Sequence, residues 1–155
     1  MYKIDDYCYI STKTILGKYA HIASHCTIAG GKDYTFKLGD YSSLASGVKI
    51  YCACEDYTNS IIGKLPSALN VNKKMLSGNV VFENYTGIGA NSVVLPNNII
   101  PEGTVIGALS FVPFNFQFES WSVYVGTPIK KINVRNKELI YQQIKSCEIM
   151  NDTSI

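Results

Sequence analysis

The sequence has few charged residues and almost no arginine or histidine. Charged side chains make up 17% of its 155 residues, whereas ~25% is usual in soluble domains. Arg135 is the single arginine, and the two histidines are His21 and His25. The net charge is +2 and no basic run of five residues occurs, so nothing indicates a nucleic-acid partner. The low charge predicts instead that some surface is buried between subunits.

A membrane-spanning stretch and a metal-binding pattern are also lacking. No apolar run approaches the ~18 residues of a membrane span, and no apolar segment of the signal-peptide kind is seen. The cysteines are Cys8, Cys26, Cys52, Cys54 and Cys147, an odd number whose spacing fits no zinc motif. We therefore expect no metal and a reducing, cytoplasmic setting. Neither Cys52 nor Cys54 has a cationic sequence neighbour that would activate a thiolate, which disfavours a covalent mechanism.

What the sequence does contain is an aliphatic residue at every sixth position. The members are Ile4, Ile10, Leu16, Ile22 and Ile28, then Leu38, Leu44 and Ile50, then Phe82, Ile88, Val94, Ile100, Ile106 and Val112. Neither a helix nor a simple strand alternation repeats every six residues. A fixed short period is typical of a β-solenoid, in which each coil buries its side chains on the next. Glycines that follow a member, such as Gly89 and Gly107, mark turns that need room or an unusual φ.

The repeat is interrupted briefly between Ile28 and Leu38 and at length over residues 52–79, and its pattern changes near the end of the chain. Residues 1–120 form the predicted repeat domain, and residues 52–79 lack the repeat and are predicted to project as an arm. Long connections without the repeat are often functional. Residues 121–155 are expected to pack on the same domain, with a helix beginning after Asn136 as N-cap and running to about Ile149. The aromatic segment before them is expected to cap the open end of the solenoid or cover a neighbour.

These features resemble the hexapeptide-repeat acyltransferases over nearly the whole chain, about Ile4 to Arg135. The closing stretch Gly126-Thr127-Pro128-Ile129-Lys130-Lys131-Ile132, followed by Arg135, is similar to the family's closing sequence. Other matching stretches are His21-Ile22-Ala23, residues 39–45, Glu55-Asp56-Tyr57, residues 87–96 and Tyr124-Val125-Gly126. They are most similar to the sugar acetyltransferase branch, which acts on nucleotide-linked sugars and surface polysaccharides.

The resemblance implies a left-handed parallel β-helix, a homotrimer, and active sites between subunits that use acetyl-CoA without a metal. It places coenzyme A along the later coils, near Gly89, Ala90, Gly107 and Ala108. The phosphates of coenzyme A would meet a basic set near the end of the chain, namely Lys130, Lys131 and Arg135. The family's usual Thr-Lys-Asp after the last coils is replaced here by Pro113-Phe114-Asn115, so the end of the cofactor groove is expected to differ.

The candidate catalytic residues are the two histidines. His21 precedes an inward aliphatic residue, so its side chain should point off the solenoid face, where it could act as general base; His25 is the weaker candidate. Related maltose and galactoside acetyltransferases carry the catalytic histidine in the arm, but residues 52–79 contain none. Either a solenoid histidine serves the site or no histidine base is used, and an amino-sugar acceptor makes the second option reasonable. This favours N-acylation over O-acylation.

Substrate contacts are predicted at Glu55, Asp56 and Tyr57, where the second run meets the arm. A carboxylate there could orient a histidine or hold the ammonium group of an acceptor, and Asp40 is a weaker candidate of the same kind. The predicted function is transfer of an acetyl group to the amine of a nucleotide-linked amino deoxy sugar for surface polysaccharide (O-antigen or capsule) synthesis. Alternatives are a sugar O-acetyltransferase, a γ-class carbonic anhydrase, for which the histidine spacing is wrong, and a non-catalytic β-helical binding module.

Overall fold

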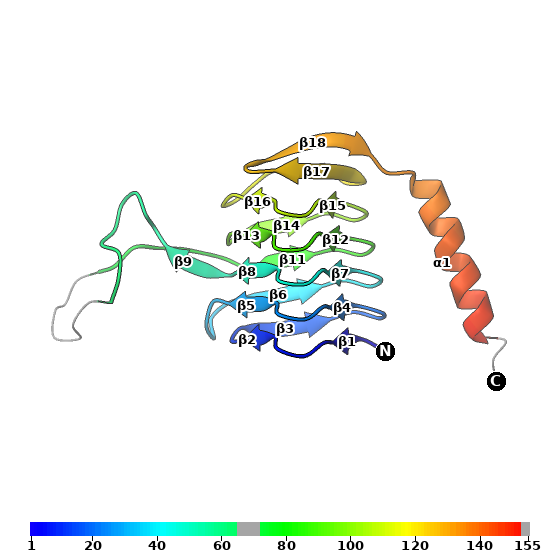
Figure 1. The fold of residues 1–155 in the computed structure, drawn as a ribbon, viewed down its shortest axis with the longest axis horizontal. Helices are drawn as coiled ribbons and strands as arrows, with labels where there is room; N and C mark the ends of the chain where they lie inside the picture. Colours follow the sequence, from blue (N-terminus) through cyan, green and yellow to red (C-terminus); the bar gives the residue numbers. More distant parts are fainter. Residues whose placement is uncertain (65–71, 153–155) are drawn as a thin grey trace.

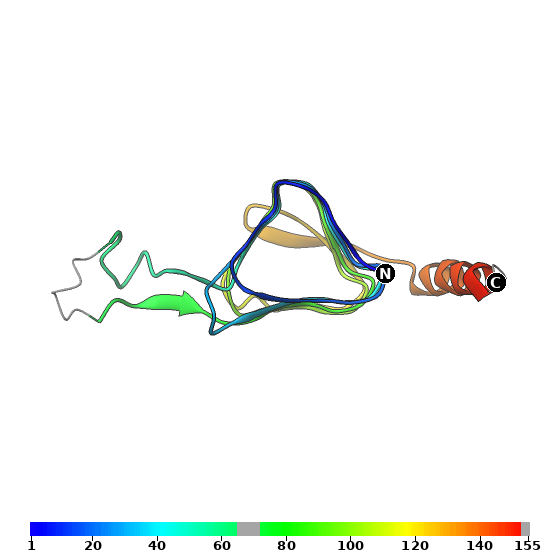
Figure 2. The same cartoon turned by 90° about the horizontal axis from the view of Figure 1, so that it is seen from below.

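The chain forms a left-handed parallel β-helix of about five coils, with one helix at its C-terminal end (Figure 1). This computed structural model describes residues 1–64 and 72–152. Each coil is a triangle whose three sides are short strands, so equivalent strands of successive coils stack into three flat faces (Figure 2). The solenoid fold predicted from the six-residue period is confirmed.

The three faces are parallel sheets with consecutive coils in register. The first face contains β1 (Lys3–Ile4), β4 (His21–Ile22), β7 (Ser43–Leu44), β12 (Gly87–Ile88), β15 (Val105–Ile106) and β17 (Ser122–Gly126), with β18 (Ile129–Val134) added antiparallel. The second contains β2 (Tyr9–Ile10), β5 (Thr27–Ala29), β8 (Lys49–Tyr51), β13 (Val93–Val94) and β16 (Phe111–Val112). The third contains β3 (Lys13–Leu16), β6 (Thr35–Leu38), β11 (Val80–Phe82) and β14 (Asn98–Ile100).

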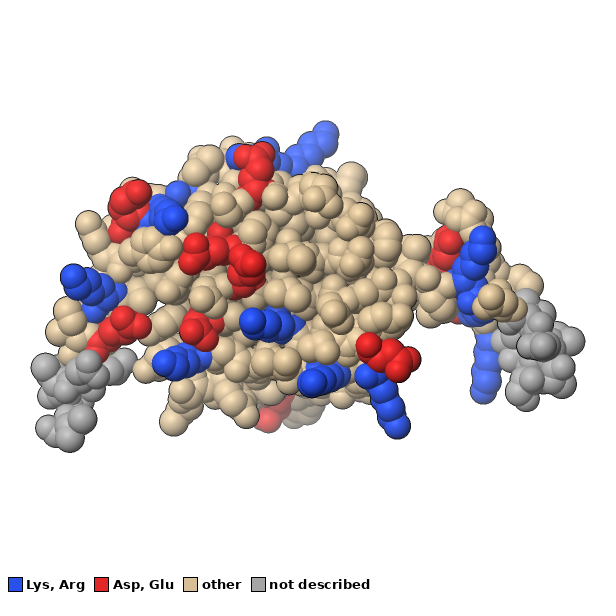
Figure 3. All heavy atoms as spheres, turned by 180° about the vertical axis from the view of Figure 1, so that it is seen from behind, with Lys and Arg blue, Asp and Glu red and all other residues tan. Residues whose placement is uncertain are grey.

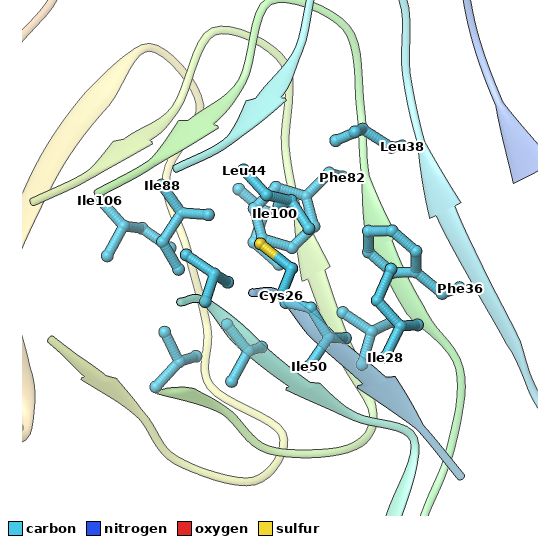
Figure 4. Close-up of a cluster of buried hydrophobic side chains, with 14 of the residues drawn as sticks. Cys26, Ile28, Phe36, Leu38, Leu44, Ile50, Phe82, Ile88, Ile100 and Ile106 are labelled. Carbon is cyan, nitrogen blue, oxygen red and sulfur yellow. The ribbon is translucent and has the colours of Figure 1, made fainter. Parts of the chain in front are cut away.

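The core is the inside of the triangle, filled by the residues of the six-residue period from Ile22 to Val112 together with others such as Cys26 and Phe36 (Figure 4). The period members Ile4 and Ile10 of the first coil are exposed, so the predicted inward burial is wrong for that coil. In β14, for example, Ile100 points inward and is fully buried, while Ile99 points outward. Phe36 and Phe82 meet edge to face at 6.0 Å on neighbouring coils. At the C-terminal end the ring of Phe116 packs against those of Phe118 and Tyr124 and against the core. The predicted capping of the open end is therefore confirmed.

The corners of the triangle use the left-handed backbone region at residues other than glycine. Tyr19 (φ 57°), Tyr41 (φ 52°) and Tyr85 (φ 62°) occupy one corner in successive coils. The glycines that directly follow the aliphatic residues have ordinary φ but tight surroundings; an added Cβ at Gly107 would lie 2.7 Å from Val125 Cγ1. Of the two reasons offered for these glycines, room is therefore the correct one and unusual φ is wrong.

The arm and the helix leave the solenoid at different corners (Figure 2). The arm starts as an antiparallel ribbon of β9 (Ala53–Glu55) and β10 (Met75–Ser77). Part of the predicted arm, residues 65–71, lies outside the described residues. Helix α1 (Lys137–Asp152) begins after Asn136, whose Oδ1 accepts a hydrogen bond from the Leu139 amide at 3.0 Å. The predicted N-cap is confirmed.

The surface has no broad area of one charge on the face shown in Figure 3, where acidic and basic side chains are interspersed. This distribution agrees with the absence of a basic patch in the sequence. Within residues 1–64 and 72–152, no helix is both long enough and apolar enough to cross a membrane.

The inward and outward residues of β14 provide a matched test of the fold. Ile100→Ala removes a fully buried side chain, which should cost about 2–5 kcal/mol and lower the melting temperature. Ile99→Ala changes a side chain that is 61% exposed and should shift stability by about 0.5 kcal/mol or less. Thermal unfolding of both variants checks this. Equal losses would contradict the inward–outward assignment.

Candidate active site

A groove of about 520 Å³ crosses β7, β12 and β15 on the first face of the solenoid. Its floor is the column of outward positions that the strand register places above one another, Ser43, Gly87 and Val105. Neighbouring strands are ~4.8 Å apart, so the column spans about two strand spacings. Gly89 and Gly107, two of the predicted coenzyme A contacts, also line it.

One wall of the groove is a stack of aromatic rings at the corner between the third and first faces. The ring centroids of Tyr19 and Tyr41 lie 4.9 Å apart, and those of Tyr41 and Tyr85 lie 5.9 Å apart. The Tyr41 hydroxyl lies 3.3 Å from Glu148 Oε1 on α1. Burial, followed by the nearby Glu148 carboxylate, raises the pKa of Tyr41 to about 12. Burial also raises the pKa of Tyr85, so both phenols stay protonated and can donate hydrogen bonds.

Arg135 joins the groove to the C-terminal helix. Its Nη1 donates to the backbone carbonyls of Tyr85 and Gly103, each at 2.7 Å, and its guanidinium lies 6.0 Å from the Trp121 ring. Burial lowers the pKa of Arg135. The guanidinium therefore bridges two coils at the aromatic corner, and it lines the groove at the same time. Whether it also binds a phosphate, as the sequence predicts, stays a prediction.

Helix α1 lies against this corner and encloses a smaller hollow of about 150 Å³. The lining residues are Tyr41, Tyr85, Arg135, Ile140, Gln143, Ile144 and Cys147. Because Tyr41, Tyr85 and Arg135 line both spaces, the hollow adjoins the groove. Tyr141 packs edge-on against Tyr85 at 5.7 Å and against Trp121 at 5.3 Å, which fixes the start of the helix on the solenoid.

The two histidines lie in different places. His21 is on the first face, one strand before Ser43 in the same column as the groove floor, and its side chain points outward as predicted. Its Nε2 lies 3.0 Å from Asp5 Oδ2, and Asp5 also pairs with Lys3 at 2.7 Å. These contacts, Lys3 first and then His21, lower the pKa of Asp5. His25 is at another corner, stacked on Tyr7 at 5.1 Å, and does not line the groove.

The predicted acidic contacts lie at the base of the arm and not at the groove. Glu55 forms an ion pair with Lys73 and accepts a hydrogen bond from the Gly63 amide. Asp56 Oδ1 accepts from the backbone amides of Thr58 (2.9 Å) and Asn59 (3.1 Å). Hydrogen bonding therefore lowers the pKa of both carboxyl groups. The largest contribution comes from the hydrogen bond of Lys73 for Glu55, and from the hydrogen bond of the Asn59 side chain for Asp56. Both are anions held in fixed orientations.

The remaining predicted residues are spread over the upper coils. Lys131 on β18 pairs with Glu119 at 2.5 Å, and Lys130 beside it is exposed. Ala90 and Ala108 lie next to the groove glycines in the chain. Tyr57 is 75% exposed on the arm. One chain thus brings Gly89, Gly107 and Arg135 to the groove and leaves the arm residues apart from it.

The groove tyrosines were missed by sequence reasoning. Their signal is a glycine two residues away in the turn: Gly17 precedes Tyr19 and Gly39 precedes Tyr41 by two positions, while Gly87 follows Tyr85 by two. Because the arm separates Tyr41 from Tyr85 in the sequence, the repetition of this turn is not apparent from the spacing. In the described part of the chain, no three side chains of histidine, cysteine, aspartate or glutamate gather where they could hold a metal ion.

Comparison with known proteins finds acyltransferases that act on nucleotide-linked amino sugars. No protein-family model matches the chain. The dTDP-4-amino-4,6-dideoxy-D-glucose acyltransferase of Escherichia coli is 35% identical over 141 residues, which cover 89% of this chain and 71% of the relative. AntD, an N-acyltransferase from Bacillus cereus in complex with dTDP and 3-hydroxybutyryl-CoA, superposes with a TM-score of 0.85 at 32% identity. The superposition covers 97% of this chain and 78% of AntD.

Other solved structures extend the comparison. Structures of AntD variants hold coenzyme A together with dTDP or with dTDP-4-amino-4,6-dideoxyglucose. A maltose O-acetyltransferase from Clostridium difficile is 19% identical with a TM-score of 0.70, over 88% of this chain and 68% of that protein. At that identity the likeness concerns the fold alone.

The two carbonyl contacts of Arg135 give a testable expectation. Arg135→Lys keeps the charge but not the planar donor group, and a carbonyl left without its donor should cost about 1–3 kcal/mol. We expect a lower melting temperature, and Lys130→Ala on exposed β18 as control should leave it unchanged. An Arg135→Lys protein of full stability that binds coenzyme A weakly would contradict the bracing role and favour phosphate binding.

Proposed function

The chain belongs to the left-handed β-helical acyltransferases that acylate nucleotide-linked amino sugars, and we propose that it transfers an acetyl group from acetyl-CoA to the amine of a dTDP-linked amino deoxy sugar. The chain is an acyl-CoA-dependent N-acyltransferase, with similarity that covers most of its length. The carbonic anhydrase and binding-module alternatives are therefore set aside. Because the relatives are named for, or bound to, dTDP-4-amino-4,6-dideoxyglucose, a 4-amino-4,6-dideoxy sugar is the first acceptor to assay.

The residues that line the groove are the observation that favours an amine acceptor over a hydroxyl acceptor. Its residues are Tyr41, Ser43, Tyr85, Thr86, Gly87, Ile88, Gly89, Val105, Ile106, Gly107 and Arg135. None of these side chains accepts a proton near pH 7, since the phenols and the guanidinium stay protonated. A hydroxyl acceptor needs a general base, whereas part of an amine population is already neutral. The lining therefore suits an acceptor that supplies its own nucleophile.

The reaction then needs no covalent enzyme intermediate. The neutral amine attacks the thioester carbonyl carbon, a C–N bond forms, and the C–S bond breaks as the tetrahedral intermediate collapses. The leaving thiolate takes up the proton that the nitrogen releases. The protein's part is to hold the two substrates in line and to offer hydrogen-bond donors to the oxyanion. Tyr85 is the phenol that the groove wall offers as a donor, because the hydroxyl of Tyr41 donates to Glu148.

The O-acetyltransferase alternative is kept because of one observation. His21 and Asp5 form a hydrogen-bonded pair at 3.0 Å in the column that leads to the groove floor. When Nε2 carries the proton that Asp5 accepts, Nδ1 is left unprotonated and can act as a base. A hydroxyl acceptor reaching this pair would have the base it requires.

The arm supplies the second half of the proposed site. The chain is proposed to form a trimer, in which the arm of one copy reaches the groove of the next. Exposed apolar side chains on the arm, Ile61 and Ile62, support a contact of that kind. Asp56 would then hold the acceptor's ammonium group before it loses its proton. The exposed Lys130 would be free to meet coenzyme A phosphates.

The cellular role follows from the substrates. Acyl-CoA and nucleotide sugars are made in the cytoplasm, so we place the enzyme there. N-acylated deoxy sugars are components of surface polysaccharides such as O-antigen and capsule, and we propose that the product enters their synthesis.

The pH dependence of the rate distinguishes the two acceptor classes. With an amino sugar at subsaturating concentration, the rate should rise with pH up to the pKa of the acceptor amine. The rise reflects the growing neutral fraction of substrate, so it should persist in His21→Asn. Thiol release from acetyl-CoA, scanned from about pH 6 to 9, measures it with dTDP-linked amino and hydroxy sugars.

A hydroxyl acceptor would behave differently. Its rate would follow the protonation state of an enzymic base and not that of the acceptor, and removing that base should lower turnover by about 10²–10⁴. Turnover with hydroxy sugars alone, abolished by His21→Asn but not by His25→Asn, would replace N-acylation by O-acylation.

Asp56→Asn tests the proposed ammonium contact. The amide oxygen of asparagine can accept the same bonds from the Thr58 and Asn59 backbone amides, so the turn should be kept. The charge is lost, together with the bond that Asp56 Oδ2 accepts from Asn59 Nδ2. We expect KM for the amino sugar to rise by about 10–100-fold, a loss of 1.4–2.7 kcal/mol, with KM for acetyl-CoA unchanged. Glu55→Gln, which weakens the pair with Lys73, is the control. Equal effects of both variants would indicate a structural role for Asp56.

A further inference from the structure

Gly87 is the one floor position of the groove without a side chain. It lies in register between Ser43 on β7 and Val105 on β15, so it is the middle of the outward column. Gly87 is the first residue of the two-residue strand β12, which lies between β7 and β15 in the sheet, and a glycine in a strand weakens it through backbone entropy and the absent side chain. A glycine at this place therefore calls for a reason.

The fold gives that reason for other glycines but not for Gly87. An added Cβ at Gly89 would overlap the backbone nitrogen of Ala108, and one at Gly39 would lie 2.6 Å from the carbonyl carbon of Glu83. At Gly87 the nearest atoms would be the Oγ and O of Ser43, at 3.8 and 3.9 Å, which is ordinary van der Waals contact. Its φ is outside the left-handed region. A side chain would fit without strain.

A side chain at this position would fill the groove. The groove extends above the backbone of β12 between the floor neighbours Ser43 and Val105, with Tyr41 and Tyr85 as its wall. Only the hydroxyl of Ser43 makes the floor column polar; next to it stand the bare backbone and an aliphatic side chain. A sugar ring, with several hydroxyl groups to satisfy, is poorly matched to such a floor. A slender, mainly aliphatic group is well matched.

We propose that Gly87 is a specificity-determining residue, on which the acyl group of the thioester donor lies, and that the missing side chain admits acyl groups larger than acetyl, up to about four carbons. This inference rests on the proposed function and deepens it. Acetyl is then the smallest donor group that the groove accepts. The relative AntD was crystallised with a four-carbon acyl donor, 3-hydroxybutyryl-CoA, which shows that a fold of this kind can hold one.

The experiment compares kcat/KM for acetyl-, propionyl- and butyryl-CoA in wild type, Gly87→Ala and Gly87→Val. We expect wild type to use all three. One added carbon changes discrimination by about 10–200-fold, so Gly87→Ala should lose that much with butyryl-CoA and much less with acetyl-CoA. Gly87→Val should lose more. Both variants should melt at or above the wild-type temperature, because a side chain strengthens the strand.

The control is Val81→Ile, which also adds one carbon to an outward strand position but on the third face. Its donor preference should equal that of wild type. Three results would overturn the proposal: a wild type that accepts acetyl-CoA alone, an equal loss for all donors in the Gly87 variants, or no loss. A change in sedimentation mass would also overturn it, since Gly87 would then be a contact between copies.

Failure of the proposed function would be visible separately. A wild-type protein without turnover on any nucleotide-linked amino sugar would contradict that function and leave the groove to be judged by binding. Thermal shift by butyryl-CoA against free coenzyme A then serves as readout, since a ligand of the native state raises the midpoint. The extra shift from the butyryl group should disappear in Gly87→Val, and its persistence would refute the role of Gly87.

Discussion

The hydrogen bonds between successive coils are the interaction on which the rest of this structure depends. Along the first face the amides of His21, Ser43 and Gly87 donate to carbonyls of the next coil at 3.0–3.2 Å. Such bonds lock equivalent positions above one another, so each position becomes a column with a single character. The interior columns are aliphatic, one corner column is aromatic, and one outward column forms a groove floor. Side chains of the site are therefore brought together because they occupy equivalent positions in successive coils, and not because they are close in sequence.

The aromatic corner shows how a local strain supports the site. A residue other than glycine in the left-handed backbone region destabilises the fold by roughly 1 kcal/mol or more. Tyrosines occupy this region in successive coils. Stacked rings each contribute about 0.5–1.5 kcal/mol, which offsets this destabilisation. Tyr85 also packs against Tyr141 of α1. The backbone carbonyls of Tyr85 and Gly103 accept the hydrogen bonds of Arg135. Stacking at the corner thus builds the groove wall as well as stabilising the turn.

The sequence was sufficient for the fold but not for the site, and the reason is physical. A six-residue period reports which side chains point inward, and it survives insertions because each run restarts in phase. The partners of an outward side chain depend on which coil lies next to it. Tyr41 and Tyr85 are neighbours in space only because the arm between them loops out. The sequence likewise does not reveal that Arg135 bonds to backbone carbonyls, or that Gly89 is needed for packing while Gly87 is not.

Departures from the repeat therefore carry more functional information than the repeat itself. A solenoid gains stability from each coil in the same way, so a position that gives up stability without a steric reason marks a demand from outside the fold. Gly87 is such a position in the groove floor, and the arm is such a departure in the chain path. Both interrupt a column that packing alone would have continued. An acyltransferase of this architecture can change donor and acceptor independently, because the floor lies on the first face whereas the arm leaves the solenoid between β8 of the second face and β11 of the third.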